Sequence, residues 1–234
     1  TLVAMEPPWC FEADAIRDEK VKVLRSVAPP SPESLVLGQY AEGVIDGQLV
    51  PGYRAEPGVA PDSDTETFVA LRLSINNWRW QGVPFLLRTG KRMPRRSTQI
   101  ALNFVCPVLH IFRQTVPLNI QANSLVLTLQ PDEGFDLRFE VKAPGAAMQL
   151  EPASLSFKYA EAFDRLPDAY ETLLLDVMTG DQTLFVRADE VEESWRLYTP
   201  LLQAMPQPHL YAAGTLGPTA ANRLMVPRGL SCPI

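Results

Sequence analysis

Histidine, cysteine and long apolar runs are scarce in this sequence of 234 residues. The two histidines, His110 and His209, stand beside no nucleophile motif and no further metal ligand, so we predict no catalytic histidine and no metal site. The three cysteines lie far apart without a CxxC pair, which is typical of reduced structural thiols. No apolar run reaches the roughly 18 residues of a membrane-spanning helix, so no membrane contact is expected.

An excess of basic residues is also missing. The chain has 21 Lys and Arg against 27 Asp and Glu, a formal charge of −6. An acidic surface repels a polyanion and no aromatic residues are interleaved with the cations, so nucleic acid is not an expected partner. The first residues, TLVAMEPPWC, have neither the basic region nor the apolar length of a signal peptide. Together with the thiols, this predicts a cytoplasmic protein whose sequence starts in the middle of a longer one.

Motifs of self-contained catalysts are absent from the sequence. It contains no GxSxG, no HExxH, no P-loop and no GxGxxG that opens a helix after a strand. A complete catalytic site is therefore not predicted within this chain.

Strict alternation of apolar and polar residues dominates the middle of the chain. It is complete in FDLRFEVKA and recurs in residues 69–75, 99–104, 125–129, 135–142 and 155–159. Repeated strands of period two with one polar face predict a largely antiparallel sheet.

Three segments have helical periodicity instead. The first follows Asp14 and ends before Pro29-Pro30. The second, PDAYETLLLDVM, starts near Pro167, stops at Gly180 and has an apolar stripe of Tyr170, Leu173, Leu174, Val177 and Met178. The third, DEVEESWRLYTPLL, has capping-box spacing at Asp189 and Glu192 and a stripe of Val191, Trp195, Tyr198 and Leu202.

The segment 38–64 is full of Gly, Pro and Asp and is predicted to be rich in loops. The pattern as a whole indicates the α+β class: a large, mainly antiparallel β-sheet with helices packed on one face. We find no internal repeat and no linker, so we predict a single domain over residues 1–234.

The sharpest local signal is a group of cations between two predicted strands, in FLLRTGKRMPRRSTQIALNF. It consists of Arg88, Lys91, Arg92, Arg95 and Arg96. Gly90 permits a turn and Pro94 stiffens it. Cations on a constrained turn suit a phosphate monoester, because charge-assisted hydrogen bonds of about 1.5–3 kcal/mol each converge there. A solvated hairpin, whose charges keep a sheet edge soluble, is an equal alternative on the local pattern alone.

Longer motifs resemble the C-terminal domain of glucose-6-phosphate dehydrogenases. They are, in order, RDEKVKVL, LVLGQY, TETFVALRLSINNWRWQGVPFLLRTGKRM, LQPDEG, LPDAYETLLLDVMTGDQTLFVRADEVEESWRLYTPLL and YAAGTLGPTAANRLM, and they cover nearly the whole chain. The resemblance implies a large antiparallel β+α domain that these enzymes join to an NADP-binding Rossmann domain. It implies oxidation of glucose 6-phosphate at C1 with hydride transfer to NADP, the first step of the pentose phosphate pathway. It also implies a homodimer or tetramer formed through the sheet.

The same resemblance assigns substrate-binding residues. In the family, the lysine of the R-x-G-K turn and a second cation five residues later belong to the sugar-phosphate site, which corresponds to Lys91 and Arg96. The glutamine before P-x-E lies close to the substrate and corresponds to Gln130. The other cations of the group are expected to be solvated or held by neighbouring acids.

Other family features are missing from this chain. The dinucleotide fingerprint, the R-I-D-H-Y-L-G-K motif and the general-base histidine have no counterpart, so NADP is expected to bind the missing N-terminal domain. Some members bind a second, structural NADP with cations where this chain has Ser97, Ala101 and Thr128, so no structural NADP is expected here. The resemblance thus predicts a substrate-binding and dimerisation fragment that is inactive alone. A non-catalytic module that kept the fold for sugar-phosphate binding or assembly is the open alternative.

Overall fold

A computed structural model describes residues 1–106, 122–145, 149–203 and 206–225. It contains two compact units, which are taken separately below. The first comprises Thr1–Pro94 with Asp168–Val226, and the second includes Arg95–Pro167. A single domain over 1–234 stays a prediction.

The first unit is built on a four-stranded sheet with the strand order β10-β1-β4-β5. Its strands are β1 (Leu35–Ala41), β4 (Phe68–Ser74), β5 (Pro84–Gly90) and β10 (His209–Ala212). β1 and β4 pair antiparallel, as do β4 and β5, whereas β10 joins β1 in parallel. A small antiparallel ribbon of β2 (Gly43–Ile45) and β3 (Gln48–Val50) follows β1.

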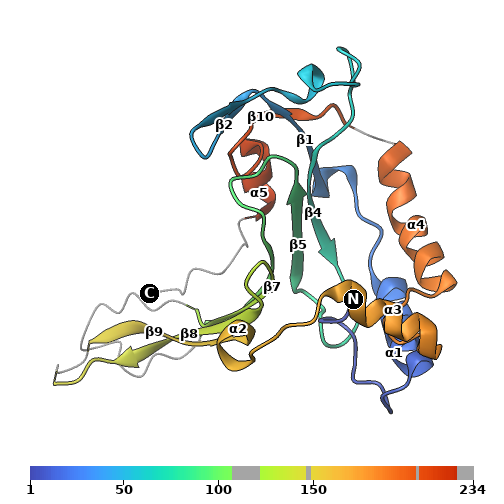
Figure 1. Cartoon of the computed structure of the whole chain (residues 1–234), viewed down its shortest axis with the longest axis vertical. Helices are drawn as coiled ribbons and strands as arrows, with labels where there is room; N and C mark the ends of the chain where they lie inside the picture. The colour runs from blue at the N-terminus through green and yellow to red at the C-terminus, as the bar shows by residue number, and fades with distance from the viewer. Residues whose placement is uncertain (107–121, 146–148, 204–205, 226–234) are drawn as a thin grey trace. The chain divides into compact units, whose positions relative to one another are not determined.

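Packed layers cover both faces of this sheet. On one face lie α1 (Ala13–Ser26) and α4 (Ala188–Gln203), which run beside the sheet in Figure 1. They form a core with the strands, made of Ala4, Val23, Leu24, Val27, Leu35, Leu37, Leu71, Leu73, Ile75, Leu197 and Leu201. On the other face a second core of Tyr40, Phe68, Ala70, Tyr211 and Ala221 is closed by α5 (Asn222–Met225) and the turn before it.

The second unit is an antiparallel meander with the strand order β6-β7-β8-β9. Its strands are β6 (Thr98–Asn103), β7 (Ser124–Gln130), β8 (Gly134–Lys142) and β9 (Leu150–Lys158), followed by the short α2 (Tyr159–Ala162). Leu127 lies opposite Phe135, and Phe135 opposite Phe157, so the apolar residues share one face. The rings of Phe135 and Phe157 stack with centroids 5.3 Å apart.

The α+β class, with helices and mainly antiparallel strands, is confirmed. The alternating segments form β4, β6, β7, β8 and β9, and VPFLLRT forms most of β5. The second predicted helix is α3 (Ala169–Thr179), whose N-cap Asp168 accepts a hydrogen bond from the Tyr170 N–H at 2.8 Å. Gly180 ends it in the left-handed conformation, with φ of 75°, which glycine adopts at no steric cost.

The start of the loop-rich segment at residue 38 is wrong, because β1 runs through Ala41, and the segment also contains the short β2 and β3. Five of the seven β1 residues are buried, on both faces of the strand. A strand buried on both faces needs no polar alternation, so the period-two signal is missing.

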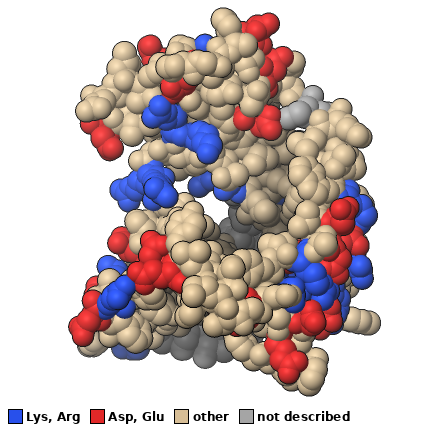
Figure 2. Space-filling model, turned by 45° about the vertical axis from the view of Figure 1, so that its right-hand side comes forward, with Lys and Arg blue, Asp and Glu red and all other residues tan. Residues whose placement is uncertain are grey.

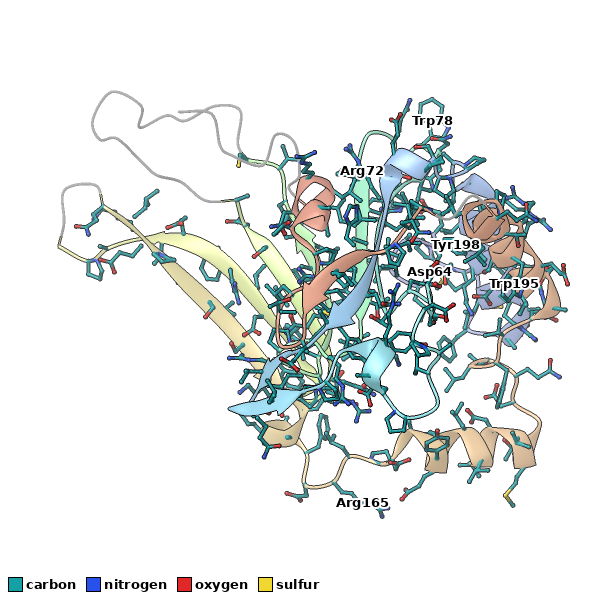
Figure 3. All side chains as sticks on the ribbon, turned by 90° about the horizontal axis from the view of Figure 1, so that it is seen from above. Asp64, Arg72, Trp78, Arg165, Trp195 and Tyr198 are labelled. Atoms are coloured by element: carbon teal, nitrogen blue, oxygen red, sulfur yellow. The ribbon has the colours of Figure 1, made fainter. Side chains whose placement is uncertain are left out.

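The apolar stripe predicted for the third helix is also wrong. The buried residues of α4 are Glu190, Leu197 and Leu201, whereas Trp195 is 57% exposed. Figure 3 shows Trp195 on the outer side of α4 and Tyr198 on the side toward the sheet. The helix is turned so that Glu190 meets Lys20 of α1 at 2.7 Å, with both side chains largely buried.

Two further expectations need correction. The apolar stripe of α3 is exposed among the described residues, since more than half the surface of Tyr170, Leu174, Val177 and Met178 is accessible. Cys106 is disulfide-bonded and Cys10 is free, so the expectation of three reduced thiols is wrong. The thiol argument for the cytoplasm therefore no longer holds, and that location stays a prediction. No helix in the described ranges has the length and apolarity to cross a membrane.

Candidate functional site

Lys91 follows β5 directly, and its main chain is held from two sides. Its N–H donates to the Thr67 carbonyl at 2.8 Å, and its carbonyl accepts from the Tyr211 hydroxyl at 2.8 Å. The side chain is exposed. Within the described residues, Nζ makes no hydrogen bond and no ion pair. A free ammonium group on a fixed backbone is the arrangement that anion binding requires.

The sequence predicted that Gly90 makes the turn after β5, and this is wrong: Arg92 has the left-handed backbone. Arg92 has φ of 50°, and its carbonyl accepts from the Gly214 N–H at 2.8 Å. Gly90 has no left-handed backbone; its lack of a side chain serves another purpose. A Cβ there would lie 2.7 Å from Cδ2 of Phe68, so glycine is needed for close approach to that ring.

The Arg92 side chain is held by an acid, as was expected for the cations beside Lys91. Its guanidinium pairs with Oε1 of Glu56 at 2.7 Å, and the Tyr40 hydroxyl donates to the same oxygen at 3.1 Å. The hydrogen bond from Arg92, followed by that from Tyr40, lowers the pKa of Glu56 below its ordinary value. Arg88 and Arg95 are exposed and have no ion-pair partner in the described ranges.

Arg96 and Gln130 lie at one end of the β6-β7 hairpin in the second unit. Thr98 pairs with Gln130, and Arg96 precedes Thr98 by two positions. Both side chains are exposed, and the peptide bond from Gln130 to Pro131 is cis. The structure thus brings these two predicted residues to one hairpin end, whereas Lys91 belongs to the first unit.

A different hollow, of about 380 Å³, lies between α1 and the start of α4. Basic and acidic side chains are interspersed on that side of the first unit (Figure 2). Arg187 contacts Asp18 at 2.6 Å and Asp189 at 2.8 Å, and these hydrogen bonds raise its pKa. The other cations of the hollow pair with Glu19 and Glu193. Because its cations are already neutralised, this hollow is a poor anion site.

Within the part of the chain that the structure describes, the histidine and the acids form no competing site. His209 begins β10 and is exposed, and His110 lies outside the described residues. Over the described ranges, no group of three or more His, Cys, Asp or Glu side chains could hold a metal ion.

A family model described as "Glucose-6-phosphate dehydrogenase, C-terminal domain" matches residues 1–231. The chain belongs to this family. It is 46% identical to a glucose-6-phosphate 1-dehydrogenase of Aggregatibacter actinomycetemcomitans over 236 residues, which is 97% of this chain and 47% of that protein. It is also 46% identical to that of Mycolicibacterium smegmatis, over 96% of this chain and 47% of the relative. The chain therefore spans about half the length of these relatives.

Solved structures give the same assignment. A glucose-6-phosphate dehydrogenase in complex with its substrate glucose-6-phosphate matches with a TM-score of 0.88 and 34% identity, over 99% of this chain and 48% of the other. A glucose-6-phosphate 1-dehydrogenase from Mycobacterium avium matches with a TM-score of 0.79 and 36% identity, over 96% and 45% of the two chains.

The positions at which some glucose-6-phosphate dehydrogenases are expected to hold a structural NADP offer no charge here. Thr128 lies opposite Gln99, whose amide donates to its hydroxyl at 3.3 Å, and Ala101 lies opposite Val126. Hydroxyl and methyl groups bring no positive charge to a 2′-phosphate or a pyrophosphate, so these three positions do not supply the cations of such a site.

Sequence reasoning did not single out the residues that hold Lys91. Thr67 and Tyr211 appear only inside longer family motifs, and no local pattern marks them. The small residues after Tyr211, which include Gly214, are a weak sign that the chain passes close to another segment there. Gly214 has φ of 83°, and a Cβ there would lie 2.1 Å from the Val44 carbonyl oxygen. Only glycine fits where the chain passes that close.

Proposed function

We propose that this chain is the substrate-binding and dimer-forming C-terminal part of a glucose-6-phosphate dehydrogenase. The whole enzyme would oxidise glucose 6-phosphate to 6-phosphogluconolactone with NADP. Family membership supports the proposal, as does the similarity to a dehydrogenase solved with glucose-6-phosphate. The observation that carries it is the exposed Lys91, whose ammonium has no partner among the described residues while its backbone is fixed.

In this proposal Lys91 and Arg96 bind the phosphate of glucose 6-phosphate, and Gln130 lies close to the sugar. Both cations are exposed, and Arg96 has no ion pair among the described residues. Each charge-assisted contact to a phosphate oxygen stabilises the complex by about 1.5–3 kcal/mol. Because the phosphate is remote from C1, these contacts act equally in the ground state and the transition state.

The rest of the catalytic site would come from the N-terminal half that the relatives carry. NADP bound there would accept the hydride, and the family's general base has no counterpart among the histidines of this chain. The isolated chain is therefore expected to be inactive. This chain joined to such an N-terminal half would be the complete enzyme.

A dimer or tetramer through the second unit's sheet is part of the same proposal. Phe135, Val141 and Leu155 of that sheet are exposed among the described residues. An antiparallel sheet with one apolar face is stable when a further layer covers that face. A second copy of the chain would supply such a layer.

The test compares the isolated chain with the complete enzyme. The chain is mixed with glucose 6-phosphate and NADP, and absorbance of reduced nicotinamide is followed beside a heat-killed control. We expect turnover only from the complete enzyme. Turnover by the isolated chain would contradict the fragment proposal. Tight sugar-phosphate binding by the chain, with no turnover in the complete enzyme, would instead favour the non-catalytic module.

A further inference from the structure

The main chain around Lys91 is held by two other segments of the chain, one at residue 67 and one at residues 211–214. Thr67, just before β4, accepts from the Lys91 N–H, and Tyr211 of β10 donates to the Lys91 carbonyl. Gly214, in the turn after β10, donates to the Arg92 carbonyl at 2.8 Å. All these residues belong to the first unit. Lys91 is thus held by contacts that its neighbours in sequence do not provide.

The Tyr211 hydroxyl is one member of a directed chain of hydrogen bonds. The Tyr40 N–H donates to Oγ1 of Thr67 at 3.0 Å, and Oγ1 of Thr67 lies 3.2 Å from Oη of Tyr211. A tyrosine hydroxyl has one hydrogen, and its shortest contact is to the Lys91 carbonyl at 2.8 Å. The Thr67 carbonyl lies farther from Oη of Tyr211, at 3.3 Å. With the Tyr211 hydrogen directed to Lys91, the Thr67 hydroxyl is the group that donates to Tyr211, and each bond polarises the next.

Packing leaves the Tyr211 side chain little freedom to move. The residue is 4% exposed. Its ring centroid lies 5.5 Å from that of Phe68 and 6.5 Å from that of Tyr40. Burial raises the pKa of its hydroxyl, so the group remains a proton donor at neutral pH. A rigid buried donor therefore meets the carbonyl of a residue whose own side chain is exposed.

We propose that Tyr211 is a positioning residue, which fixes the Lys91 backbone so that the ammonium group meets the phosphate of glucose 6-phosphate. This inference rests on the proposed function. Tyr211 itself does not touch the substrate in this account. Its hydroxyl acts through the Lys91 carbonyl, and Thr67 acts through Tyr211.

Tyr211→Phe keeps the packed ring and removes only the hydroxyl, which leaves the Lys91 carbonyl without its donor. Loss of one such hydrogen bond corresponds to about 10-fold in an equilibrium constant. We expect the exchange of the Lys91 amide hydrogen to accelerate by about that factor. The KM for glucose 6-phosphate should rise about 5- to 10-fold, with a smaller change in kcat and none in the KM for NADP.

The experiment measures both quantities in the complete enzyme: hydrogen exchange at Lys91 and steady-state kinetics. The matched control is Tyr198→Phe, which removes a hydroxyl from another partly buried tyrosine of the first unit. The described residues give that hydroxyl no hydrogen-bond partner, so neither readout should move. Thr67→Val should reproduce the Tyr211→Phe effect in weaker form, and Thr67→Ser, which keeps the hydroxyl, should restore both readouts.

Two results with Tyr211→Phe would overturn the inference. If the Lys91 amide hydrogen exchanged faster but the KM for glucose 6-phosphate stayed the same, the hydroxyl would serve only the fold. If the Lys91 amide hydrogen exchanged at an unchanged rate, the hydroxyl would not hold the Lys91 backbone. If Lys91→Ala leaves the KM for glucose 6-phosphate unaltered, the proposed function itself fails, and that result is visible without any Tyr211 variant.

Discussion

The two units of this protein differ in how completely the apolar faces of their sheets are covered. The first unit covers both faces of its sheet, and almost all the buried apolar residues among those described belong to it. The second unit contributes only Cys106 and Ala143 to that set, while Phe135 and Leu155 remain exposed. Both sheets have four strands, so strand number does not explain the difference.

This difference indicates which unit can hold a functional side chain in a fixed position. A hydrogen bond from a side chain to the main chain, such as that from the Tyr211 hydroxyl to the Lys91 carbonyl, is rigid only if its donor is packed on all sides, as in the first unit. The second unit has well-paired strands but an open apolar face, so its side chains depend on a further surface. We therefore expect the two units to respond differently to the same substitutions.

The largest effect is expected from a matched pair of leucines. Leu197 of the first unit is 2% exposed and Leu155 of the second unit is 61% exposed. Leu197→Ala should lower the free energy of unfolding by about 3 kcal/mol, because it leaves a cavity in a closed core. Leu155→Ala should lower it by less than about 1 kcal/mol. Urea unfolding of the chain measures both.

If both variants lost the same unfolding free energy at every protein concentration, the difference between the two units would be contradicted. If the loss for Leu155→Ala grew with protein concentration, the result would indicate that a second copy covers the apolar face of the second unit.

The next effect concerns one cation from each unit. Lys91→Ala and Arg96→Ala should each raise the KM for glucose 6-phosphate of the complete enzyme about 10-fold or more, from about 1.5–3 kcal/mol per phosphate contact. The kcat should change less, and the KM for NADP little. Arg88→Ala is the control, because it removes the same charge from the strand that leads to Lys91. If all three variants behaved alike, the solvated-hairpin interpretation would replace the phosphate site.

A third prediction concerns the open sheet of the second unit. Leu155→Asp places a charge on its apolar face and should raise the dimer dissociation constant by about 10-fold, since an unpaired charge is costly in an apolar interface. Ser154→Asp changes the neighbouring residue, which lies opposite Arg138 on the polar face, and should have little effect. Sedimentation at several concentrations compares them. A monomeric unmodified chain, or a larger effect at Ser154, would count against an interface on the apolar face.

The smallest effect concerns the ion pair beside Lys91. Arg92 lowers the pKa of Glu56 below the ordinary value of about 4.3 in the unfolded chain. A carboxylate with a lowered pKa stabilises the folded state above that value, and the stabilisation is lost as pH falls through the folded-state pKa. Glu56→Gln should therefore lower the Tm slightly at neutral pH, and the difference should vanish in acid, below the folded-state pKa of Glu56. A Tm difference that persists in acid would mean that the pair acts through packing instead.

Local signals were sufficient for most elements of both units. Alternation predicted the strands of the meander because side chains of a strand point to opposite faces with period two. Asp168 and Gly180 marked the ends of α3 because a helix leaves its terminal N–H and carbonyl groups unpaired. Lys91, Arg96 and Gln130 were identified by their place in family motifs, and whether they bind substrate is still to be tested.

Only the tertiary structure decided the remaining features, because each depends on residues far apart in the chain. β1 lacked a polar alternation because layers on both faces bury it. The face that α4 buries, Glu190, Leu197 and Leu201, packs against α1 and the sheet, which are distant in the sequence. The hydrogen bonds to the Lys91 main chain come from Thr67 and Tyr211, which are 144 positions apart. The sequence determined the elements and the cation, whereas long-range packing and hydrogen bonds determined how firmly that cation is held.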